Sequence, residues 1–489
     1  MSIIRKHSIY GSIYSYLGVI LGFVINLLIY PNVFTTEQIG LFTILVAYAG
    51  LLSSFAGLGI NMVGIKIFPM FRDEKTKNHG FLGFVFLINM VGFVIVSFLF
   101  YLLKSLFLKA GQEGLFNDYS YTIFTILFFY VLFLVFDLYY RVMYNPSIGI
   151  LHKDVIQRLL VIGAYMLYYF KIADFDQTVS YYVWAQILPT VLLILFLIKD
   201  RLFHFSFDFK FLDRERLMGI MKLNFHGILL SFASVIALRL DLIMIHWLKD
   251  LSSVGVYFVT FSIATLVLIP YRTMGKVSGI VIAEAYDQKD YKLIQDIASK
   301  SSITLFIIGA LLLIGIWGNM DTAFLLLKED YRPGMYVILL IGIANLVETS
   351  IGVSSQLLFY SGLHKKLTLI MYVYLLLLVV LNLIFIPLYG IIGAAIATML
   401  SKIIATTLKW YYLRKEIDIQ VIGYRQLVIV ALGILVYFLS QWIHLDNPYF
   451  HFILRSAFIS LAFLIPLYIL RLSEDMNAWI EKIYRRFAK

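Results

Sequence analysis

The sequence contains no cysteine among its 489 residues, which excludes structural disulfides and cysteine-ligated metals. Charge is also scarce. Only 14% of the residues are charged and 61% are hydrophobic, whereas a soluble domain averages about 25% charged and about 45–50% apolar residues. The mean hydropathy is +0.88. These proportions exclude an ordinary soluble domain and predict a protein that crosses a membrane many times.

A catalytic constellation is missing as well. The segment Asp174-Phe175-Asp176 has no further acid and no histidine nearby in the sequence. No His/Glu spacing typical of a metal site and no phosphate-cradling glycine loop occurs. We therefore expect neither an enzyme nor a cofactor or metal. A membrane-embedded polymerase or acyltransferase, the alternative from another functional class, needs a reactive histidine or acid cluster at a membrane face.

Apolar runs long enough to cross a bilayer fill most of the chain, since a transmembrane helix needs about 20 apolar residues. The predicted fold is an all-α, polytopic membrane protein with both termini in the cytoplasm. Its fourteen predicted transmembrane helices lie at about 9–30, 40–64, 81–103, 119–140, 155–172, 179–198, 218–247, 254–275, 297–318, 335–360, 367–388, 391–413, 423–443 and 451–470.

The basic residues are distributed unevenly over the loops of this map. Of the 40 lysines and arginines, 31 lie in or beside inside loops, seven lie in outside positions, and Arg239 and Lys402 lie within spans. Basic residues concentrate on the cytoplasmic side of membrane proteins. The net charge of +11 thus follows from topology and implies no nucleic-acid partner. We expect a multi-pass protein of the bacterial inner (plasma) membrane, surrounded by membrane lipids.

The longest inside loop divides the chain. We expect an N-terminal lobe of six helices at 1–200, a cytoplasmic linker at 201–217 and a C-terminal lobe of six helices at 218–413. Two further helices follow at 414–470, then a basic cytoplasmic tail at 471–489. In the tail, Met476, Trp479, Ile480 and Ile483 alternate with charges, which predicts an amphipathic segment on the inner membrane surface.

The two halves also align with each other after a shift of 215 residues. Asn26-Leu27-Leu28-Ile29 then falls on Asp241-Leu242-Ile243-Met244, and the segment 37–42 falls on 252–257. Six helices per half is an even number, so both halves would have the same orientation in the membrane. This arrangement is typical of transporters built from parallel repeats.

Three segments carry a resemblance to a known family. They are Glu37-Gln38-Ile39-Gly40-Leu41-Phe42 with Ala56-Gly57-Leu58-Gly59-Ile60, then the stretch from Asp241 to Tyr257, and most clearly Asn382 to Thr398 with Pro387 and Gly390 at a turn. They resemble polysaccharide biosynthesis proteins, the lipid-linked oligosaccharide (O-antigen type) flippases. The resemblance implies the multidrug/oligosaccharidyl-lipid/polysaccharide exporter superfamily, with two six-helix lobes, two extra helices, alternating access and a monomeric state.

Two charges lie deep inside predicted spans. Glu348 is near the middle of the tenth span, where Asn345, Thr349, Gly352, Ser355 and Gln356 share its face at i, i+3, i+4 and i+7 spacing. Lys402 lies about 11 residues, or about 16 Å, from the inner end of the twelfth span, too far for its side chain to reach water. Each charge therefore needs an internal partner, and Glu348 is the candidate partner of Lys402. The pair would be either a structural lock or a switch that substrate or a proton opens.

Arg239 and Asp241 form a second charged position, in the seventh span. They are two residues apart, or about 200° around a helix, so they cannot point into one cavity. Arginine suits diphosphate recognition because its planar guanidinium binds phosphate oxygens at two points. In the first half, Asp137 and Arg141 are expected to form an ion pair. Hydrogen bonds between helices are expected from the other buried polar groups, Asn26, Asn61, Asn89 and Gln186.

The charges and the resemblance together predict a flippase. It would move a polyprenyl-diphosphate-linked oligosaccharide across the inner membrane by alternating access, for polysaccharide or O-antigen (lipopolysaccharide) biosynthesis. Arg239 and Lys402 would attract the diphosphate, Asn345 and Gln356 would contact sugar, and Glu348 or Asp241 would couple transport to H⁺ or Na⁺. The alternatives within the superfamily are a multidrug/cation antiporter and a lipid II flippase.

Overall fold

The computed structural model describes residues 2–73, 75–107, 114–208, 211–478 and 481, with side chains except at 2–9, 104–107, 226, 229–238, 276, 277, 280 and 326. Most of the described residues are helical and none forms a strand, which confirms the all-α prediction. The chain forms two compact units, Met1–Gly255 and Val256–Lys489. Trp479, Ile480 and Ile483 of the predicted amphipathic tail lie outside the described residues.

Each of the fourteen predicted spans falls mainly on helical residues. Among the described residues, nine helices are long and apolar enough to cross a membrane, or ten if the pair Glu329–Thr349 and Ser354–Tyr360 counts as one span. The 54-residue α18 accounts for two predicted spans, because Gly390 has a non-helical conformation (φ 61°, ψ −134°) within it. A positive φ favours glycine, so the predicted turn after Pro387 is present. The chain is a multi-pass membrane protein.

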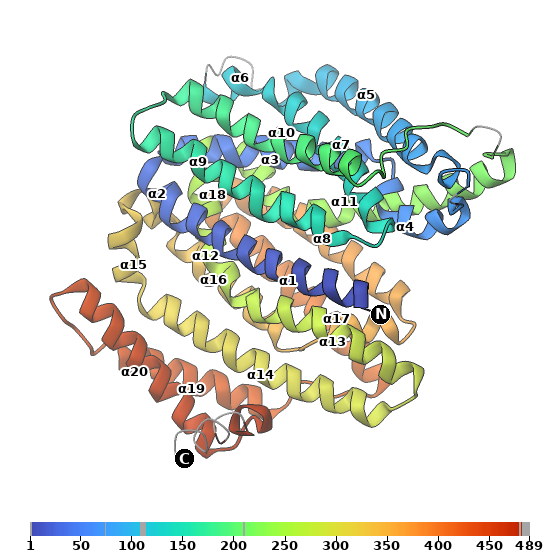
Figure 1. Cartoon of the computed structure of the whole chain (residues 1–489). Helices are drawn as coiled ribbons and strands as arrows, with labels where there is room; N and C mark the ends of the chain where they lie inside the picture. Colours follow the sequence, from blue (N-terminus) through green and yellow to red (C-terminus); the bar gives the residue numbers. More distant parts are fainter. Residues whose placement is uncertain (1, 74, 108–113, 209–210, 479–480, 482–489) are drawn as a thin grey trace. The chain divides into compact units, whose positions relative to one another are not determined.

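The first unit is a bundle in which α3 packs against α5, α7 and α11, while α10 packs against α7 and α9 (Figure 1). Its helices are α1 (Ser2–Phe23), α2 (Tyr30–Val33), α3 (Thr36–Ala56), α4 (Ile60–Phe71), α5 (Phe81–Phe107), α6 (Leu115–Tyr119), α7 (Thr122–Val142), α8 (Pro146–Ile150), α9 (Gln157–Tyr169), α10 (Phe175–Lys199) and α11 (Arg214–Leu248). The π-helices η1 (Val24–Ile29) and η3 (Leu151–Ile156) connect α1 to α2 and α8 to α9, and the 3₁₀ turn η2 (Asn78–Gly80) precedes α5.

The second unit contains a layer in which α14 packs against α19 and α20, next to α16 and α18, which pack on each other (Figure 1). The unit boundary falls within α12. The elements are α12 (Leu251–Ala264), η4 (Thr265–Leu268), α13 (Ile269–Asp287), α14 (Tyr291–Gly318), α15 (Met320–Leu327), η5 (Glu329–Gly334), α16 (Met335–Thr349), α17 (Ser354–Tyr360), α18 (His364–Ile417), α19 (Tyr424–Ser440) and α20 (Pro448–Ile469).

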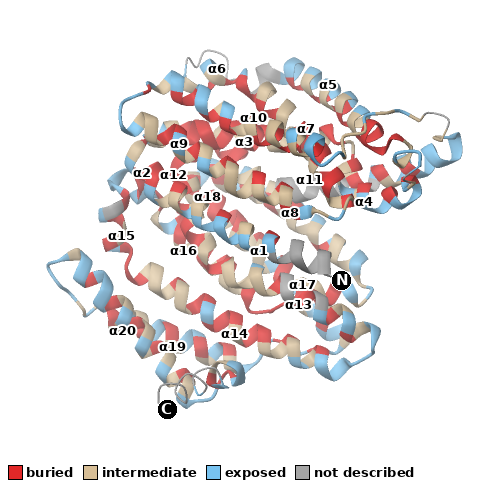
Figure 2. Ribbon diagram, in the orientation of Figure 1, coloured by how far each residue is buried: buried red, intermediate tan, exposed pale blue. Residues whose placement is uncertain are grey.

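Buried and exposed positions alternate along single helices, as Figure 2 shows. Large apolar side chains such as Val94 and Phe98 of α5 remain exposed, and such a face suits contact with lipid. Buried polar side chains instead bond to other helices. Asn61 of α4 and Asn89 of α5 exchange hydrogen bonds of 3.0 and 3.4 Å, so the predicted packing role of these two residues is confirmed.

The 215-residue shift relates positions that touch each other within the first unit. A Cβ atom added to Gly40 would collide with the carbonyl group of Leu251, and one added to Gly255 would collide with the carbonyl group of Thr36. The shift maps residue 36 onto 251 and residue 40 onto 255, so the contact is reciprocal. The Thr36 and Ser252 hydroxyl oxygens lie 2.6 Å apart beside it. Glycine at both positions lets the two backbones approach this closely.

Candidate functional site

The predicted pair between Glu348 and Lys402 is present in the second unit. The Lys402 Nζ atom of α18 donates to Glu348 Oε2 at 2.9 Å and to Asn345 Oδ1 at 2.8 Å, both on α16. The Asn345 amide nitrogen in turn donates to the Ala264 carbonyl oxygen at 2.9 Å. Asn345 is 1% exposed, while the ionic side chains retain 19% (Lys402) and 21% (Glu348). The ammonium group thus has two oxygen partners and some access to solvent.

Positive charge exceeds negative charge around this pair. Arg272 of α13 and Lys409 of α18 also lie within electrostatic range of the Glu348 carboxylate, so one acid faces three cations. Tyr271 lies close to both Glu348 and Ser355. An excess of cations in a protein interior is costly without anionic partners, and the group therefore favours an additional anion.

The predicted polar face of the tenth span is interrupted, so the prediction of one continuous helix was wrong. The chain bends by 45° between Glu329–Thr349 and Ser354–Tyr360, and Gly352 in the break has φ +55°. The Ser302 hydroxyl oxygen lies 2.5 Å from the carbonyl oxygen of Ser350 and 2.8 Å from that of Val421, so these two acceptors share its one proton. Side-chain hydrogen bonds of this kind satisfy the backbone groups that a broken helix frees.

Gln356 lies beyond the break, against α13. Its amide nitrogen would lie 2.7 Å from a Cβ atom at Gly275. Its amide oxygen is buried without a hydrogen-bond partner in the described part of the chain. An unsatisfied buried acceptor is rare in folded proteins, which makes this oxygen a candidate acceptor for a ligand.

Arg239 lies in the first unit, on the uninterrupted helix α11. It is within electrostatic range of Tyr30, Tyr130 and Tyr182 and of Lys153. Three tyrosines and a second cation thus lie near the guanidinium group. Asp241 is half-buried and has interactions of its own. The unbroken helix keeps the predicted angle of about 200° between Arg239 and Asp241.

Lys153 is the member of this group that sequence reasoning missed. The fifth span was predicted to begin at about 155, with Lys153 in an inside loop, but helical residues begin at Pro146 and continue through η3 to Tyr169. The Lys153 Nζ atom lies 4.3 Å from the ring centroid of Tyr130 and 5.4 Å from that of Phe133. Aromatic faces attract cations at such distances. The cations within the first unit are therefore more numerous than predicted.

A neighbouring pair shows how the first unit holds other charges. Arg158 of α9 lies 4.0 Å from Asp154 and donates to the Gly18 carbonyl oxygen of α1. Gly18 and Gly22 lie one turn apart and leave room for Asp154 and Arg158 respectively, since a Cβ atom at either glycine would crowd that side chain. Small residues four apart are typical of close helix contacts in membranes. This pair is an internal contact between α1 and the segment η3–α9.

Other predicted polar groups also have structural partners. Arg141 Nε lies 3.0 Å from Asp137 Oδ2, as predicted. Gln157 donates to Gln186 between α9 and α10. Asp174 caps the N-terminus of α10, where its side chain accepts a hydrogen bond from the Gln177 backbone amide at 2.8 Å.

Arg455, one of the seven cations predicted at outside positions, lies about two turns into α20. It is 1% exposed and donates to the carbonyl oxygens of Gly318 at 2.7 Å and Ile443 at 3.1 Å. Its two hydrogen bonds tie α20 to the end of α14 and to the segment before α20.

No known family description matches the sequence, and no curated protein sequence matches it. Solved structures do match. A structure of the lipid II flippase MurJ in an inward closed conformation superposes with a TM-score of 0.75 at 16% identity, covering 94% of this chain and 98% of MurJ. An inward-facing multidrug resistance MATE family transporter of the MOP superfamily gives 0.62 at 16% identity, covering 82% and 98%.

A MOP superfamily transporter from Pyrococcus furiosus, whose binding pocket is described as having reverse polarity, gives a TM-score of 0.55 at 16% identity. The match covers 85% of this chain and 95% of that one. At such low identity the likeness concerns the fold alone. The chain therefore has the fold of MOP superfamily transporters.

Proposed function

We propose that the protein is a flippase that moves a polyprenyl-diphosphate-linked oligosaccharide across the inner membrane by alternating access, in the synthesis of a surface polysaccharide such as O-antigen. Arg239 and Lys153 bind the diphosphate in the first unit. Lys402 offers a further cation in the second. Asn345 and Gln356 contact sugar, and Glu348 or Asp241 couples transport to H⁺ or Na⁺.

The observation that carries this proposal is the pair of cations formed by Arg239 and Lys153. They lie within electrostatic range of each other. Asp137 and Asp154 also lie within electrostatic range of Lys153, but no carboxylate of the described residues lies within 4.0 Å of either cation, so neither is directly paired. Two like charges held together repel each other unless an anion joins them. A diphosphate supplies two adjacent anionic groups, and arginine with lysine is a suitable pair of ligands for it.

The second unit suggests how a coupling ion takes part. Lys402 is neutralised by Glu348 at 2.9 Å, so a phosphate that binds Lys402 must compete with this carboxylate. A proton or sodium ion on Glu348 removes the competitor. Binding of the phosphate to Lys402 and binding of the proton or sodium ion to Glu348 are then linked, because each is favoured when the ion pair between Lys402 and Glu348 is broken.

Lipid II is the second candidate substrate, because the likeness to MurJ extends over 94% of the chain. It carries the same diphosphate, so only the headgroup distinguishes it from an oligosaccharide lipid. A cationic drug, as expected for a multidrug antiporter, is disfavoured by the two cations of the first unit. A drug cavity of that kind requires acidic groups in their place.

Flipping in proteoliposomes tests the proposal. Purified protein is reconstituted with a polyprenyl-diphosphate-linked oligosaccharide, and exposure of the glycan on the opposite leaflet is followed with a membrane-impermeant glycosidase. We expect Arg239→Gln and Lys153→Gln each to slow the initial rate by roughly 10-fold or more, since a hydrogen bond to a charged group contributes about 1.5–3 kcal/mol. Lys292→Gln, at an exposed lysine of α14, is the matched control and should retain the rate.

Two results would contradict the proposal. One is flipping at the wild-type rate by the double variant Arg239→Gln/Lys153→Gln. The other is uptake of a cationic dye that the oligosaccharide lipid does not inhibit, which would establish the antiporter instead. Lipid II assayed in parallel decides between the two headgroups.

A further inference from the structure

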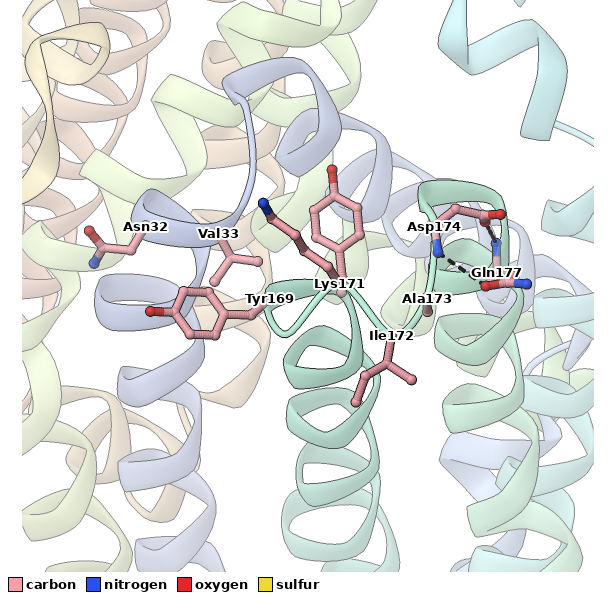
Figure 3. A pocket seen from close by; sticks show the side chains of 9 residues that line it. Asn32, Val33, Tyr169, Lys171, Ile172, Ala173, Asp174 and Gln177 are labelled. Carbon is pink, nitrogen blue, oxygen red and sulfur yellow. Dashed lines mark hydrogen bonds between the residues drawn. The ribbon is translucent and has the colours of Figure 1, made fainter.

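A pocket of about 610 Å³ lies in the first unit where α2 and α9 end and α10 begins. None of its lining residues belongs to the charged groups described above. Figure 3 shows Tyr169 and Lys171 extending from the end of α9 toward α2, while Asp174 and Gln177 lie on the other side of the turn. The side chains that give the pocket its chemistry are Asn32, Tyr168, Tyr169, Lys171, Asp174 and Gln177.

The backbone of the pocket is firmly held. The amide of Lys171 donates to the Tyr168 carbonyl oxygen, and that of Ile172 to the Leu167 carbonyl oxygen, both at 2.9 Å. Lys171 itself has φ +59°, a conformation that non-glycine residues adopt infrequently. Asp174 and Gln177 then exchange side-chain hydrogen bonds with each other's backbone amides at 3.0 and 2.8 Å. The lining residues are thus positioned by the fold before any ligand arrives.

The two tyrosines differ in their surroundings. Tyr168 is half-buried, and its ring stacks on Phe34 with centroids 5.1 Å apart and planes 6° apart. Phe34 packs in turn on Tyr165 and Phe42. Tyr169 is 57% exposed. The pocket therefore combines a fixed aromatic wall with an open one, and both rings carry a hydroxyl group that can hydrogen-bond a ligand.

The pocket lining holds one basic side chain, Lys171, and one acidic side chain, Asp174, and they do not pair with each other. No carboxylate of the described residues lies within 4.0 Å of the Lys171 amine. The Asp174 carboxylate already accepts a hydrogen bond from the Gln177 backbone. Asn32 and Gln177 add side-chain amides that both donate and accept. A ligand that fits has an apolar face for the tyrosines, several hydroxyl groups for the amides, and one negative charge for the lysine.

We infer that this pocket binds a sugar residue that carries a carboxylate, of the uronic acid type. The C–H face of a pyranose ring packs on a tyrosine, its hydroxyl groups bond to Asn32 and Gln177, and its carboxylate pairs with Lys171. The pocket has room for one or two such rings. This site goes beyond the proposed function, because it uses none of the cations assigned to the diphosphate.

Saturation-transfer-difference NMR on the full-length protein in nanodiscs tests the inference. The probes are glucuronate, glucose and glycerol 3-phosphate. We expect glucuronate to give the strongest ring-proton signals, about 5-fold weaker in Lys171→Gln and lost in Tyr169→Ala. Tyr121→Ala removes an exposed tyrosine that does not line the pocket and should leave the signals unchanged. Arg239→Gln should also leave them unchanged, which separates this site from the proposed transport site.

Two outcomes overturn the assignment. If glucuronate gives no signal above that of Tyr169→Ala, the pocket is not a sugar site, and its tyrosines are membrane-interface residues. If glycerol 3-phosphate matches or exceeds glucuronate and depends equally on Lys171, the pocket holds a phospholipid headgroup. Neither outcome affects the proposed function, which is measured by flipping.

Discussion

Removing one charge of the Glu348–Lys402 pair should destabilise the protein far more than removing both. Glu348→Gln leaves the ammonium group beside an amide, with Arg272 and Lys409 still in range. Lys402→Met leaves the carboxylate without its partner at 2.9 Å. In either variant one ion remains in a largely desolvated place. The double variant Glu348→Gln/Lys402→Met removes both ions of the pair and should recover part of the lost stability, although Arg272 and Lys409 then lack the carboxylate.

The expected magnitude follows from the geometry. At an effective dielectric constant of about 20, unit charges 2.9 Å apart attract each other by about 6 kcal/mol. Desolvation of the two ions offsets a large part of this attraction. Because both side chains remain about one-fifth exposed, we expect a coupling free energy of about 2–3 kcal/mol, within the range measured for close charge pairs.

A second pair in the same unit provides the control. Lys300 and Asp296 of α14 lie 2.7 Å apart, but their side chains are 37% and 59% exposed. Exposed pairs typically contribute about 0.2–1 kcal/mol. Each pair is tested by a double-mutant cycle, with Glu348→Gln and Lys402→Met for the first pair and Asp296→Asn and Lys300→Met for the control pair. The free energy of unfolding of each variant is measured by SDS titration in mixed micelles. A coupling below about 1 kcal/mol for Glu348–Lys402, or one equal to the control, would refute the electrostatic reasoning.

The same variants separate the two roles that the pair can have. If the pair is only a structural lock, the double variant recovers flipping together with stability. If the pair is a switch, the double variant recovers stability but not flipping, because Lys402 is no longer present to bind phosphate and Glu348 is no longer present to bind the coupling ion. Flipping in proteoliposomes, measured on all four proteins at matched protein content, gives the answer.

Two further predictions concern contacts within single units. Thr36→Cys/Ser252→Cys should form a disulfide on mild oxidation, since the hydroxyl oxygens that the sulfurs replace lie 2.6 Å apart and the chain has no other cysteine. A protease site inserted between residues 201 and 213 allows the chain to be cut between the two cysteines, and gel mobility then shows whether the fragments stay linked. Failure to cross-link would disprove the contact. Arg455→Leu should destabilise the protein by about 1–3 kcal/mol, because it leaves the Gly318 and Ile443 carbonyl oxygens without their donor. Thermal unfolding measures this change. A variant at least as stable as wild type would show that the free-energy cost of burying the guanidinium group exceeds the gain from its hydrogen bonds.

The Glu348–Lys402 contact was predictable because both charges lie deep within predicted spans, where each needs a partner of opposite charge. Each charge lies near the middle of an apolar run, too far from either end to reach water, and few other partners exist in the second half of the sequence. The second hydrogen-bond acceptor of Lys402, Asn345, could not be predicted from the sequence. Asn345 contacts Lys402 because of the way α16 packs on α18, and no sequence spacing determines that packing.

The cation pair of the first unit could not be predicted in this way, because hydropathy places the ends of helices poorly. Lys153 lies in η3, preceded by the apolar α8, and its polar neighbours lowered the local hydropathy enough to resemble a loop. The break in the tenth span left a clearer signal. Thr349-Ser350-Ile351-Gly352-Val353-Ser354-Ser355 combines a glycine with four hydroxyl side chains, and such residues favour non-helical backbone.

The two units hold half-buried cations by different means, and this difference bears on the order of transport steps. In the first unit, the faces of Tyr130 and Phe133 stabilise Lys153. Asp137 and Asp154 lie within its electrostatic range, but no carboxylate of the described residues pairs with it directly, so a phosphate can bind there without breaking an ion pair. In the second unit, Glu348 occupies Lys402, so a phosphate must displace a carboxylate. If the proposed function holds, the diphosphate binds first at Arg239 and Lys153, and Lys402 becomes available only after Glu348 takes up its proton or sodium ion. Pyrophosphate should then inhibit flipping at every pH and sodium concentration, because it can always bind Arg239 and Lys153. The Lys402→Met variant should be inhibited less than wild type only under conditions that neutralise Glu348.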